Sequence, residues 1–375
     1  MRLRRRSVPC KQLSSSRQGS AVLRLRRTKP APDEIAGGSK QLGGQRRWTL
    51  DALDAYRGLI AFIAVFILGV IFTPRSLETG LPVFLSLRTQ LDILYEYSEY
   101  GLLATGMTLV ILSGGIDLSV GSVVGLCAML FALLTIGLGW SMAGAVPVVI
   151  VAGLAAGAVS GTLISRFRMQ PFVATLAMMV AARGFAKLVS GGAKVQPAAE
   201  RWYAFKQGTP HFFRWMTQSL PGVVLQPCTI LFLVSIVVMA VVVRYTTYGR
   251  RLYAIGGNEE AARLSGIKVG WNKVATYALC AGFAALAGIV NACRQDMGDP
   301  EAGFGFELDA IAAVVIGGTS LMGGRGGMML TLIGVLIIAY NNNILSLNAV
   351  PIAPRMIIQG AIIAIAVLIQ QQRRR

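Results

Sequence analysis

Long apolar blocks recur from Gly58 to the end of the chain and constrain its fold more than any other feature. A helix needs roughly 20 mostly apolar residues to cross a hydrocarbon core about 30 Å thick. Only 14% of the residues are charged, whereas an ordinary soluble domain carries about 25%. The pattern predicts an all-α fold, a polytopic transmembrane helical bundle of about ten spans. The expected spans are 58–72, 91–112, 120–138, 145–164, 172–189, 228–243, 274–291, 308–321, 328–344 and 352–369.

Positive charge is concentrated in the tails and in short segments between the apolar blocks, for example "MRLRRRS", "SRFR", "YGRR" and "QQQRRR". Basic residues in short loops mark the cytoplasmic side of a membrane, and basic tails attract anionic lipid. We therefore expect both termini and the loop near 244–273 in the cytoplasm, and the acidic stretch "QDMGDPEAG" outside. The net charge of +19 does not predict a nucleic-acid partner, because no binding fold accompanies it.

Residues 1–57 are rich in Arg, Ser, Gly and Pro and contain no apolar stretch of the kind found in a signal peptide. This composition predicts a basic, disordered cytoplasmic leader. A start codon assigned too far upstream explains the same residues and stays open. We expect residues 58–375 to form the transmembrane domain.

No catalytic or metal-binding pattern is present. The chain has a single histidine, contains no HExxH or GxSxG motif, and never places Lys after Gly. The phosphate loop of ATP-hydrolysing proteins, GxxxxGK[ST], is therefore absent. The five cysteines form no CxxC pair. We expect no enzyme activity, no metal and no cofactor in this chain.

Two polar interruptions divide the apolar blocks: "SGGIDLSVGS" at 113–122 and "IGGTSLMGGRGG" at 316–327. The first sets Asp117 between two spans, where an ionisable group is costly unless it is capped, paired or hydrated. Either Asp117 or Ser119 caps the next helix, or the broken segment lines a transport route. Both interpretations stay open.

Glycine and alanine recur at helical spacing in two of the spans. Gly153, Gly157 and Gly161 are four residues apart, and so are Ala281 and Ala285. Small residues at this spacing let helix backbones approach closely in lipid. We therefore predict helix packing at these positions rather than a substrate groove.

The loop "YAIGGNEEAARLSGI" is the most polar segment between two long apolar runs. Asn258 is a good N-cap, Glu259 and Glu260 place negative charge in the first turn, and Gly266 supplies a stop. These features predict a helix of roughly Glu259–Ser265. Because isolated helices shorter than about 12 residues are marginal in water, something must hold this helix. Its small residues suit insertion into a cleft of a partner, and a tight turn packed on its own spans is the alternative.

Four ordered stretches carry a resemblance to a known family: "GMTLVILSGGIDLSVGS", "QPFVATLAMMVAARG", "YGRRLYAIGGNEEAARLSGI" and "FELDAIAAVVIGGTSLMGGRGG". The chain resembles the ribose-type membrane permeases of bacterial ABC importers from about Gly58 to the C-terminus. The resemblance implies that the short helix is a coupling helix seated in a cleft of a cytoplasmic ATPase, which hydrolyses the ATP. The implied contacts are Gly257, Asn258, Glu259, Glu260, Ala261, Ala262, Arg263 and Gly266.

The same resemblance implies the rest of the assembly. Two permease copies, or one copy and a close paralogue, would pair in the bacterial inner membrane around a pathway for ribose or a related monosaccharide. An external binding protein would deliver the sugar. An ABC permease for branched-chain amino acids and an ion-driven secondary transporter are the alternatives. The candidate route residues are Asp117, Ser119, Ser122, Thr175 and Asn291.

Overall fold

A computed structural model describes residues 58–77, 79–196, 211–219, 222 and 224–372. Every described residue belongs to one compact unit, Thr49–Arg375. The expected basic leader at 1–57 lies outside the described residues and stays a prediction.

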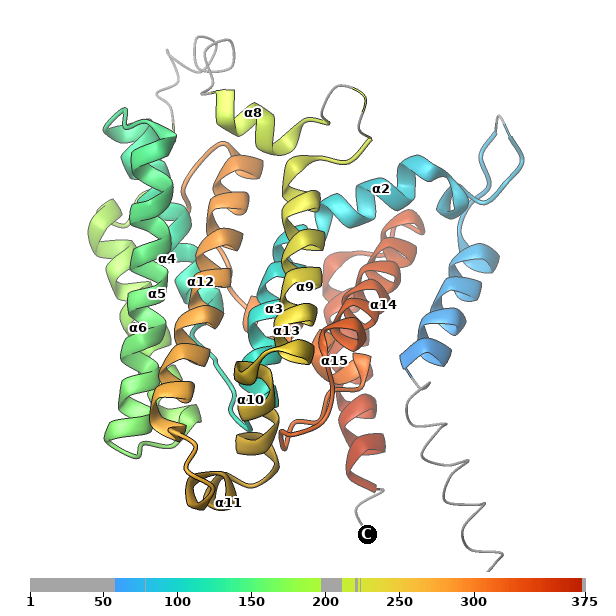
Figure 1. Ribbon diagram of the computed structural model, residues 1–375. Coiled ribbons are helices and arrows are strands. Elements are labelled where there is room, and N and C mark those ends of the chain that lie inside the picture. The colour runs from blue at the N-terminus through green and yellow to red at the C-terminus, as the bar shows by residue number, and fades with distance from the viewer. Residues whose placement is uncertain (1–57, 78, 197–210, 220–221, 223, 373–375) are drawn as a thin grey trace, which may run out of the picture. The chain divides into compact units, whose positions relative to one another are not determined.

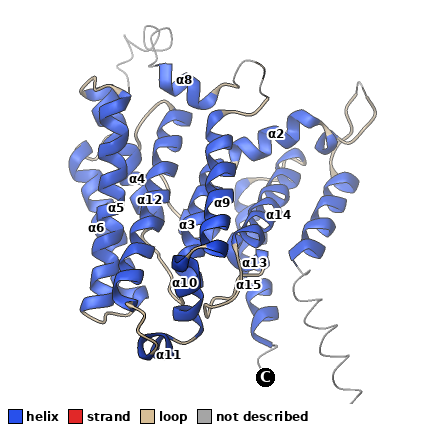
Figure 2. Ribbon diagram, in the orientation of Figure 1, coloured by secondary structure: helices blue, strands red, loops and turns tan. Residues whose placement is uncertain are grey.

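Every regular element in the described part of the chain is a helix (Figure 2), which confirms the predicted all-α fold. The only strand-like pairs there are two isolated bridges, Arg75 with Pro82 and Val195 with Gly298. In chain order the elements are a first helix Gly58–Phe72, η1 Val83–Leu85, α2 Leu87–Glu96, α3 Ser98–Leu112, α4 Val120–Ala132, η2 Leu133–Gly137, α5 Met142–Arg166, α6 Pro171–Ser190, α8 His211–Thr217, α9 Pro227–Tyr245, α10 Thr247–Gly257, α11 Glu259–Leu264, α12 Val269–Gln295, α13 Phe306–Gly317, α14 Met328–Leu347 and α15 Ile352–Gln372.

Among the described residues, six helices are long and apolar enough to cross a membrane: α4 continued by η2, α5, α6, α9, α12 and α14. Three shorter apolar helices accompany them, Gly58–Phe72, Ser98–Leu112 and Ile352–Ile365. The chain is therefore a polytopic helical membrane protein. The count of about ten spans stays a prediction, because it also requires α13, which has only 12 residues.

The described helices run up and down between two ends of one bundle, which we name the α11 end and the α8 end after the helices that mark them (Figure 1). The first helix starts, and α15 finishes, toward the α11 end. The longest helix, α12, packs most extensively against α5, and next against α4 and α3. Helix α12 starts next to the loop around α11 and runs to the α8 end (Figure 1).

The predicted small-residue seam joins α5 to α12. A methyl group placed on Gly153 would lie 2.6 Å from the Cβ of Ala285, and one on Gly157 would lie 2.7 Å from the Cβ of Ala281. The two backbones approach so closely that glycine is required on one side. The prediction of helix packing at these positions is confirmed.

The expected span at 91–112 is divided in the structure. Helix α2 lies across the α8 end, and α3 turns into the bundle after Tyr97 (Figure 1). The Ser86 side chain caps α2 by accepting from Thr89 N at 3.1 Å. Because α2 carries exposed Arg88 and Asp92, it suits the membrane surface better than the hydrocarbon core.

Candidate functional site

The loop around α11 is built by local capping, as the sequence predicts. The Asn258 side chain accepts from Ala261 N at 3.0 Å, and Gly266 adopts φ +81° after the last turn. Ile267 N donates to Ala262 O at 3.1 Å, which closes the C-terminal end of the helix. The observed helix, Glu259–Leu264, is one residue shorter than predicted. The predicted cap, acidic first turn and glycine stop are confirmed.

Two sets of contacts hold α11 against its own chain. Ala262 is only 4% exposed and packs with Ile255 of α10 and Val269 of α12. Glu259 forms ion pairs with Arg263 at 3.3 Å and with Lys273 of α12 at 2.7 Å. The structure therefore places Ala262 on the inner face of the helix, so it supports α11 rather than presenting a surface to a partner.

The outer side of this loop carries two large apolar side chains. Leu264 is 81% exposed and Trp271 is 76% exposed. Single exposed apolar residues are common on proteins, but Leu264 ends α11 and Trp271 lies in the first turn of α12, so both belong to the same short stretch of the chain. Neither residue is among the contacts predicted above, although an apolar side chain among charged residues is a signal visible in the sequence. Gly257, Asn258, Glu260, Ala261, Arg263 and Gly266 are exposed with them.

The two polar interruptions meet at the α11 end. Gly324 N, in the α13–α14 turn, donates to Leu112 O at the end of α3 at 3.0 Å. A methyl group on Gly323 would lie 2.8 Å from Gly114 Cα and 2.9 Å from Gly256 Cα. We call Gly114, Gly256, Gly257, Gly323 and Gly324 the glycine junction. It brings both interruptions into direct contact with α10, the helix that leads into α11.

A tyrosine strengthens this contact beside the junction. Tyr253 of α10 donates its hydroxyl to Gly326 O at 2.8 Å. The end of α10 is therefore bonded to the α13–α14 turn as well as packed against it.

Asp117 is completely buried in the turn between α3 and α4. One carboxylate oxygen accepts from Ser119 N at 2.9 Å and from Ser119 Oγ at 2.6 Å. The other has no hydrogen-bond partner among the described residues, and neither has the buried hydroxyl of Tyr277. Ser119 directly precedes α4, but its side chain makes no capping bond. The prediction that Asp117 or Ser119 caps α4 is therefore wrong. The Asp117 carboxylate instead fixes the loop between α3 and α4 through its two bonds from Ser119.

The other candidate route residues lie on three different helices. Ser122 is buried on α4. Thr175 of α6 donates to Pro171 O of its own helix at 2.9 Å, and Asn291 of α12 donates to Glu99 at 3.0 Å. Within the described part of the chain, no hydrogen bond joins these three to one another or to Asp117 and Ser119. Their role in a route stays a prediction.

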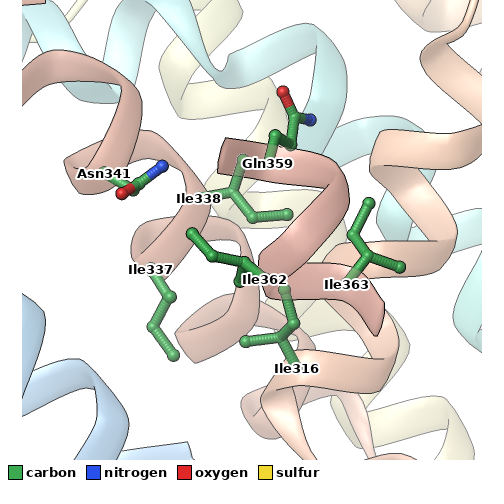
Figure 3. Close-up of a pocket in the computed structure, with 7 residues that line it drawn as sticks. All are labelled: Ile316, Ile337, Ile338, Asn341, Gln359, Ile362 and Ile363. Carbon is green, nitrogen blue, oxygen red and sulfur yellow. The ribbon is translucent and has the colours of Figure 1, made fainter. Parts of the chain in front are cut away.

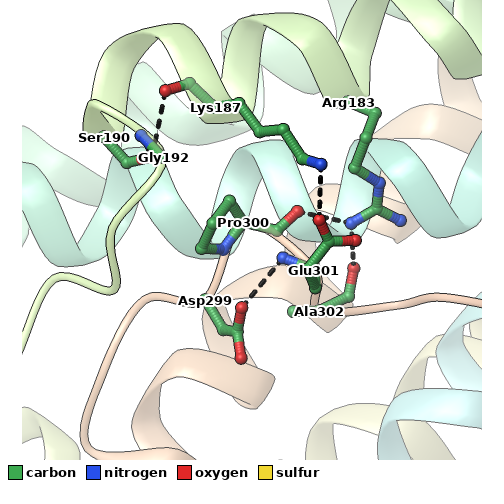
Figure 4. A network of polar contacts seen from close by, with 8 residues as sticks. All are labelled: Arg183, Lys187, Ser190, Gly192, Asp299, Pro300, Glu301 and Ala302. Atoms are coloured by element: carbon green, nitrogen blue, oxygen red, sulfur yellow. Dashed lines mark hydrogen bonds and ion pairs between the residues drawn. The ribbon is translucent and has the colours of Figure 1, made fainter.

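The segment between α12 and α13 is clamped at the α8 end (Figure 4). Lys187 pairs with Glu301 at 2.6 Å, and Lys194 pairs with Asp299 at 2.7 Å. Arg183 donates to Pro300 O at 2.5 Å and to Ala302 O at 2.8 Å. These contacts fix the segment to α6 and to the residues that follow it.

The clamp also shifts the acidity of its two carboxyl groups. Burial raises the pKa of Asp299, but the hydrogen bonds from Lys194 and Glu301 N outweigh it, so the pKa lies below its ordinary value. The hydrogen bond from Lys187 lowers the pKa of Glu301. Both groups therefore carry negative charge at neutral pH.

Comparison with known proteins identifies the family. The model of the family described as "Branched-chain amino acid transport system / permease component" matches residues 90–367. The chain belongs to this permease family. The ribose import permease protein RbsC of Escherichia coli K12 is 37% identical over 335 residues, which cover 89% of this chain and 99% of that protein.

Two further relatives agree with this assignment. RbsC of Bacillus subtilis 168 is 39% identical over 317 residues, 83% of this chain and 92% of that protein. The xylose transport system permease protein XylH of Escherichia coli K12 is 34% identical over 342 residues, 78% of this chain and 87% of that protein. No solved structure gives a significant match.

A small cavity in this permease lies among α13, α14 and α15 (Figure 3). It is lined mainly by isoleucines, with Asn341 and Gln359 as its polar members. Its volume of about 10 Å³ has room for at most one water molecule. The cavity is therefore a small gap in the packing of these helices and is too small for a sugar.

Proposed function

We propose that this permease is the membrane subunit of an ATP-binding cassette importer for a monosaccharide. The observation that carries the proposal is identity of 37–39%, over most of the chain, to proteins named ribose import permeases. The match to a xylose permease favours a sugar over the branched-chain amino acids in the family description. ATP is hydrolysed by a separate subunit, in keeping with the absence of a phosphate loop from the sequence.

The loop around α11 is the proposed docking element for that ATPase. Its outer surface offers Gly257, Asn258, Glu260, Ala261, Arg263, Leu264 and Gly266, while Ala262 and Glu259 hold the helix to its own chain. Leu264 adds an apolar side chain that is free to be buried in a cleft of a partner. A helix fixed in this way transmits a push as a rigid body rather than bending.

The glycine junction is the proposed link between that motion and the pathway. Movement of α10 acts directly on the α3–α4 and α13–α14 turns, because the backbones touch. Asp117, Ser119, Ser122, Thr175 and Asn291 are proposed to lie along the route. The unpartnered carboxylate oxygen of Asp117 supports this role, since a buried polar atom without a partner is costly unless function requires it.

The charge distribution and the likeness to the ribose permeases support the rest of the proposed assembly. The α11 end faces the cytoplasm with both termini, and the α8 end faces the external binding protein that delivers the sugar. A second copy or a close paralogue completes the pathway in the bacterial inner membrane, and anionic lipid contacts the basic segments.

Leu264→Asp tests the docking element. The side chain is exposed and its replacement leaves the bundle intact, so the permease should insert normally. We expect co-purification with the ATPase and sugar uptake to fall about tenfold or more, because one buried leucine contributes roughly 1.5–3 kcal/mol. Leu77→Asp is the matched control, since Leu77 is likewise an exposed leucine and lies far from α11 in the chain. Unchanged co-purification of the Leu264→Asp permease, or uptake that persists without any ATPase, contradicts the proposal.

A further inference from the structure

The segment from Asp296 to Gly305 descends into the bundle beside α4. A methyl group on Gly298 would lie 2.7 Å from Ala132 Cβ, near the outer end of α4. Further along, a methyl group on Gly125 would lie 2.7 Å from Ala302 O, and one on Gly303 would meet the carbonyl oxygen of Gly121. The segment therefore passes beside about 11 residues of α4, which correspond to roughly 16 Å of helix. We call residues 296–305 the re-entrant segment.

Helix α13 begins only after this descent. Its 12 residues span about 18 Å at 1.5 Å per residue, against a hydrocarbon core of about 30 Å. The residues that lead into α13 form separate turns rather than a continuous helix, closed by Ala302 N donating to Asp299 O at 3.0 Å and Phe306 N donating to Gly303 O at 3.2 Å. Irregular backbone at membrane depth is tolerated only where it is buried in protein or lines a water-filled cavity.

A cavity of about 390 Å³ lies at this segment. Its walls come from α12, from the residues that follow α6, and from the re-entrant segment with the start of α13. The volume lies in the usual range for small-ligand sites, about 300–1,000 Å³. The lining residues used below are Lys194, Asn291, Gln295, Asp299, Phe304 and Phe306.

The walls of this cavity combine hydrogen-bonding groups with aromatic faces. Gln295 carries an exposed amide, which both donates and accepts hydrogen bonds. The buried amide of Asn291 already donates to Glu99 at 3.0 Å. Phe304 lies between two glycines and is 82% exposed, so its ring is free to contact a ligand. A sugar ring presents hydroxyl groups at its edge and C–H groups on its faces, and it requires both kinds of wall.

The charges in these walls are already matched. The Asp299 and Lys194 side chains lie 2.7 Å apart, and Glu301 pairs with Lys187 at 2.6 Å. The backbone pair between Val195 and Gly298, at 2.8 and 2.9 Å, fixes the same region. A rigid wall without uncompensated charge suits a neutral ligand better than an ion or an amino acid.

We propose that this cavity is the site where the permease receives a neutral, polyhydroxylated ligand of monosaccharide size from the α8 end. The inference rests on the proposed function and adds a location and a ligand chemistry to it. Gln295, Phe304 and Phe306 are new site residues, and Asn291 joins them to the predicted route.

Gln295→Cys tests the site in right-side-out membrane vesicles that contain the complete importer with its ATPase and binding protein. Gln295 is exposed, and the four described cysteines are all buried. We expect D-ribose or D-xylose to slow modification of Gln295→Cys by a membrane-impermeant maleimide about fivefold, and L-leucine to leave the rate unchanged. Ser141→Cys, exposed at the same end of the bundle and absent from the cavity wall, is the matched control and should show no protection.

Gln295→Leu supplies a second readout, because it keeps the size of the side chain and removes its hydrogen bonds. We expect ATP-dependent uptake of the protecting sugar to fall about tenfold, the usual effect of losing a hydrogen bond to a ligand, while co-purification with the ATPase is unchanged. Normal uptake by Gln295→Leu, protection by leucine, or equal protection of Ser141→Cys overturns the inference. Absence of ATP-dependent uptake of both sugars by the unaltered importer overturns the proposed function instead.

Discussion

The backbone N–H of Gly324 donates to the carbonyl oxygen of Leu112 at 3.0 Å. This bond joins the turn after α3 to the turn after α13, and Gly256 of α10 packs against both partners. The junction allows no side chain at its centre, since a methyl group on Gly256 would lie 2.5 Å from Gly324 N. The helix that leads into α11 is therefore in backbone contact with both polar interruptions of the transmembrane domain.

Gly256→Ala should separate these backbones. We expect the free energy of unfolding to fall by about 1–3 kcal/mol, the usual cost of overpacking a closely packed site. Thermal unfolding of the purified permease in detergent measures the loss. Gly270→Ala is the matched control, because its methyl group would meet only Ser165 Cβ at an ordinary 3.7 Å. Equal stability of the two variants contradicts close packing at Gly256.

The capped loop was predictable from the sequence because its signals are local. Asn258, the two glutamates and Gly266 each act on the adjoining end of one short helix, and the structure shows each in the expected place. The inward orientation of Ala262 was not predictable, because it depends on Ile255 and Val269 from the adjoining helices. A residue pattern read along one helix does not say which face the neighbouring helices cover.

The two polar interruptions show the same limit at longer range. The sequence shows each as a polar interruption between apolar blocks, but their contact with Gly256 joins three segments far apart in the chain. The re-entrant segment was predicted only as an acidic external loop. Its path depends on close packing against Gly121 and Gly125 of α4. Nothing in the stretch "QDMGDPEAG" itself indicates which distant residues it will contact.

Lys273→Met should loosen α11 without unfolding the bundle. The Lys273 ammonium lies 2.7 Å from Glu259 and its side chain is only 15% exposed, so it joins α11 to α12. We expect amide hydrogen exchange in Glu259–Leu264 to accelerate several-fold, in line with roughly 0.2–1 kcal/mol for a partly exposed ion pair. Hydrogen exchange with mass spectrometry measures the change.

Two comparisons test whether the ion pair causes that change. Lys268→Met removes an exposed lysine of the same loop and should leave the exchange rates as they are. In a double-mutant cycle, the effects of Glu259→Gln and Lys273→Met should be less than additive, because both remove the pair between these two residues, while Glu259→Gln also removes the pair with Arg263. Fully additive effects contradict a direct pair.

Asp299→Asn should reduce stability at neutral pH and have no effect in acid. Because the pKa of Asp299 is lowered in the folded protein, its carboxylate stabilises the fold above the unfolded-state pKa of about 3.9. That contribution decreases as the pH falls through the lowered pKa, where both states become protonated. We expect a difference of about 0.2–1 kcal/mol between the two proteins near neutral pH, and none at sufficiently low pH.

Thermal unfolding of both proteins over a pH series measures this difference. Lys194→Met should show the same loss near neutral pH, because it removes the other member of the pair. A difference between Asp299→Asn and the unaltered protein that grows toward acid contradicts the assigned direction of the pKa shift.

Asp117→Asn tests the proposed route at its most buried polar residue. An asparagine oxygen accepts the two bonds from Ser119 as the carboxylate does, so the turn should form and the thermal stability should change by less than about 1 kcal/mol. The substitution replaces the unpartnered oxygen with an amide and removes the ionisable proton. We expect sugar uptake to fall about tenfold or more while co-purification with the ATPase is retained. Ser119→Ala is the comparison, since it removes one bond to Asp117 and keeps the carboxylate. Normal uptake by Asp117→Asn would contradict a role for Asp117 in the route and leave it only the structural role in the loop between α3 and α4.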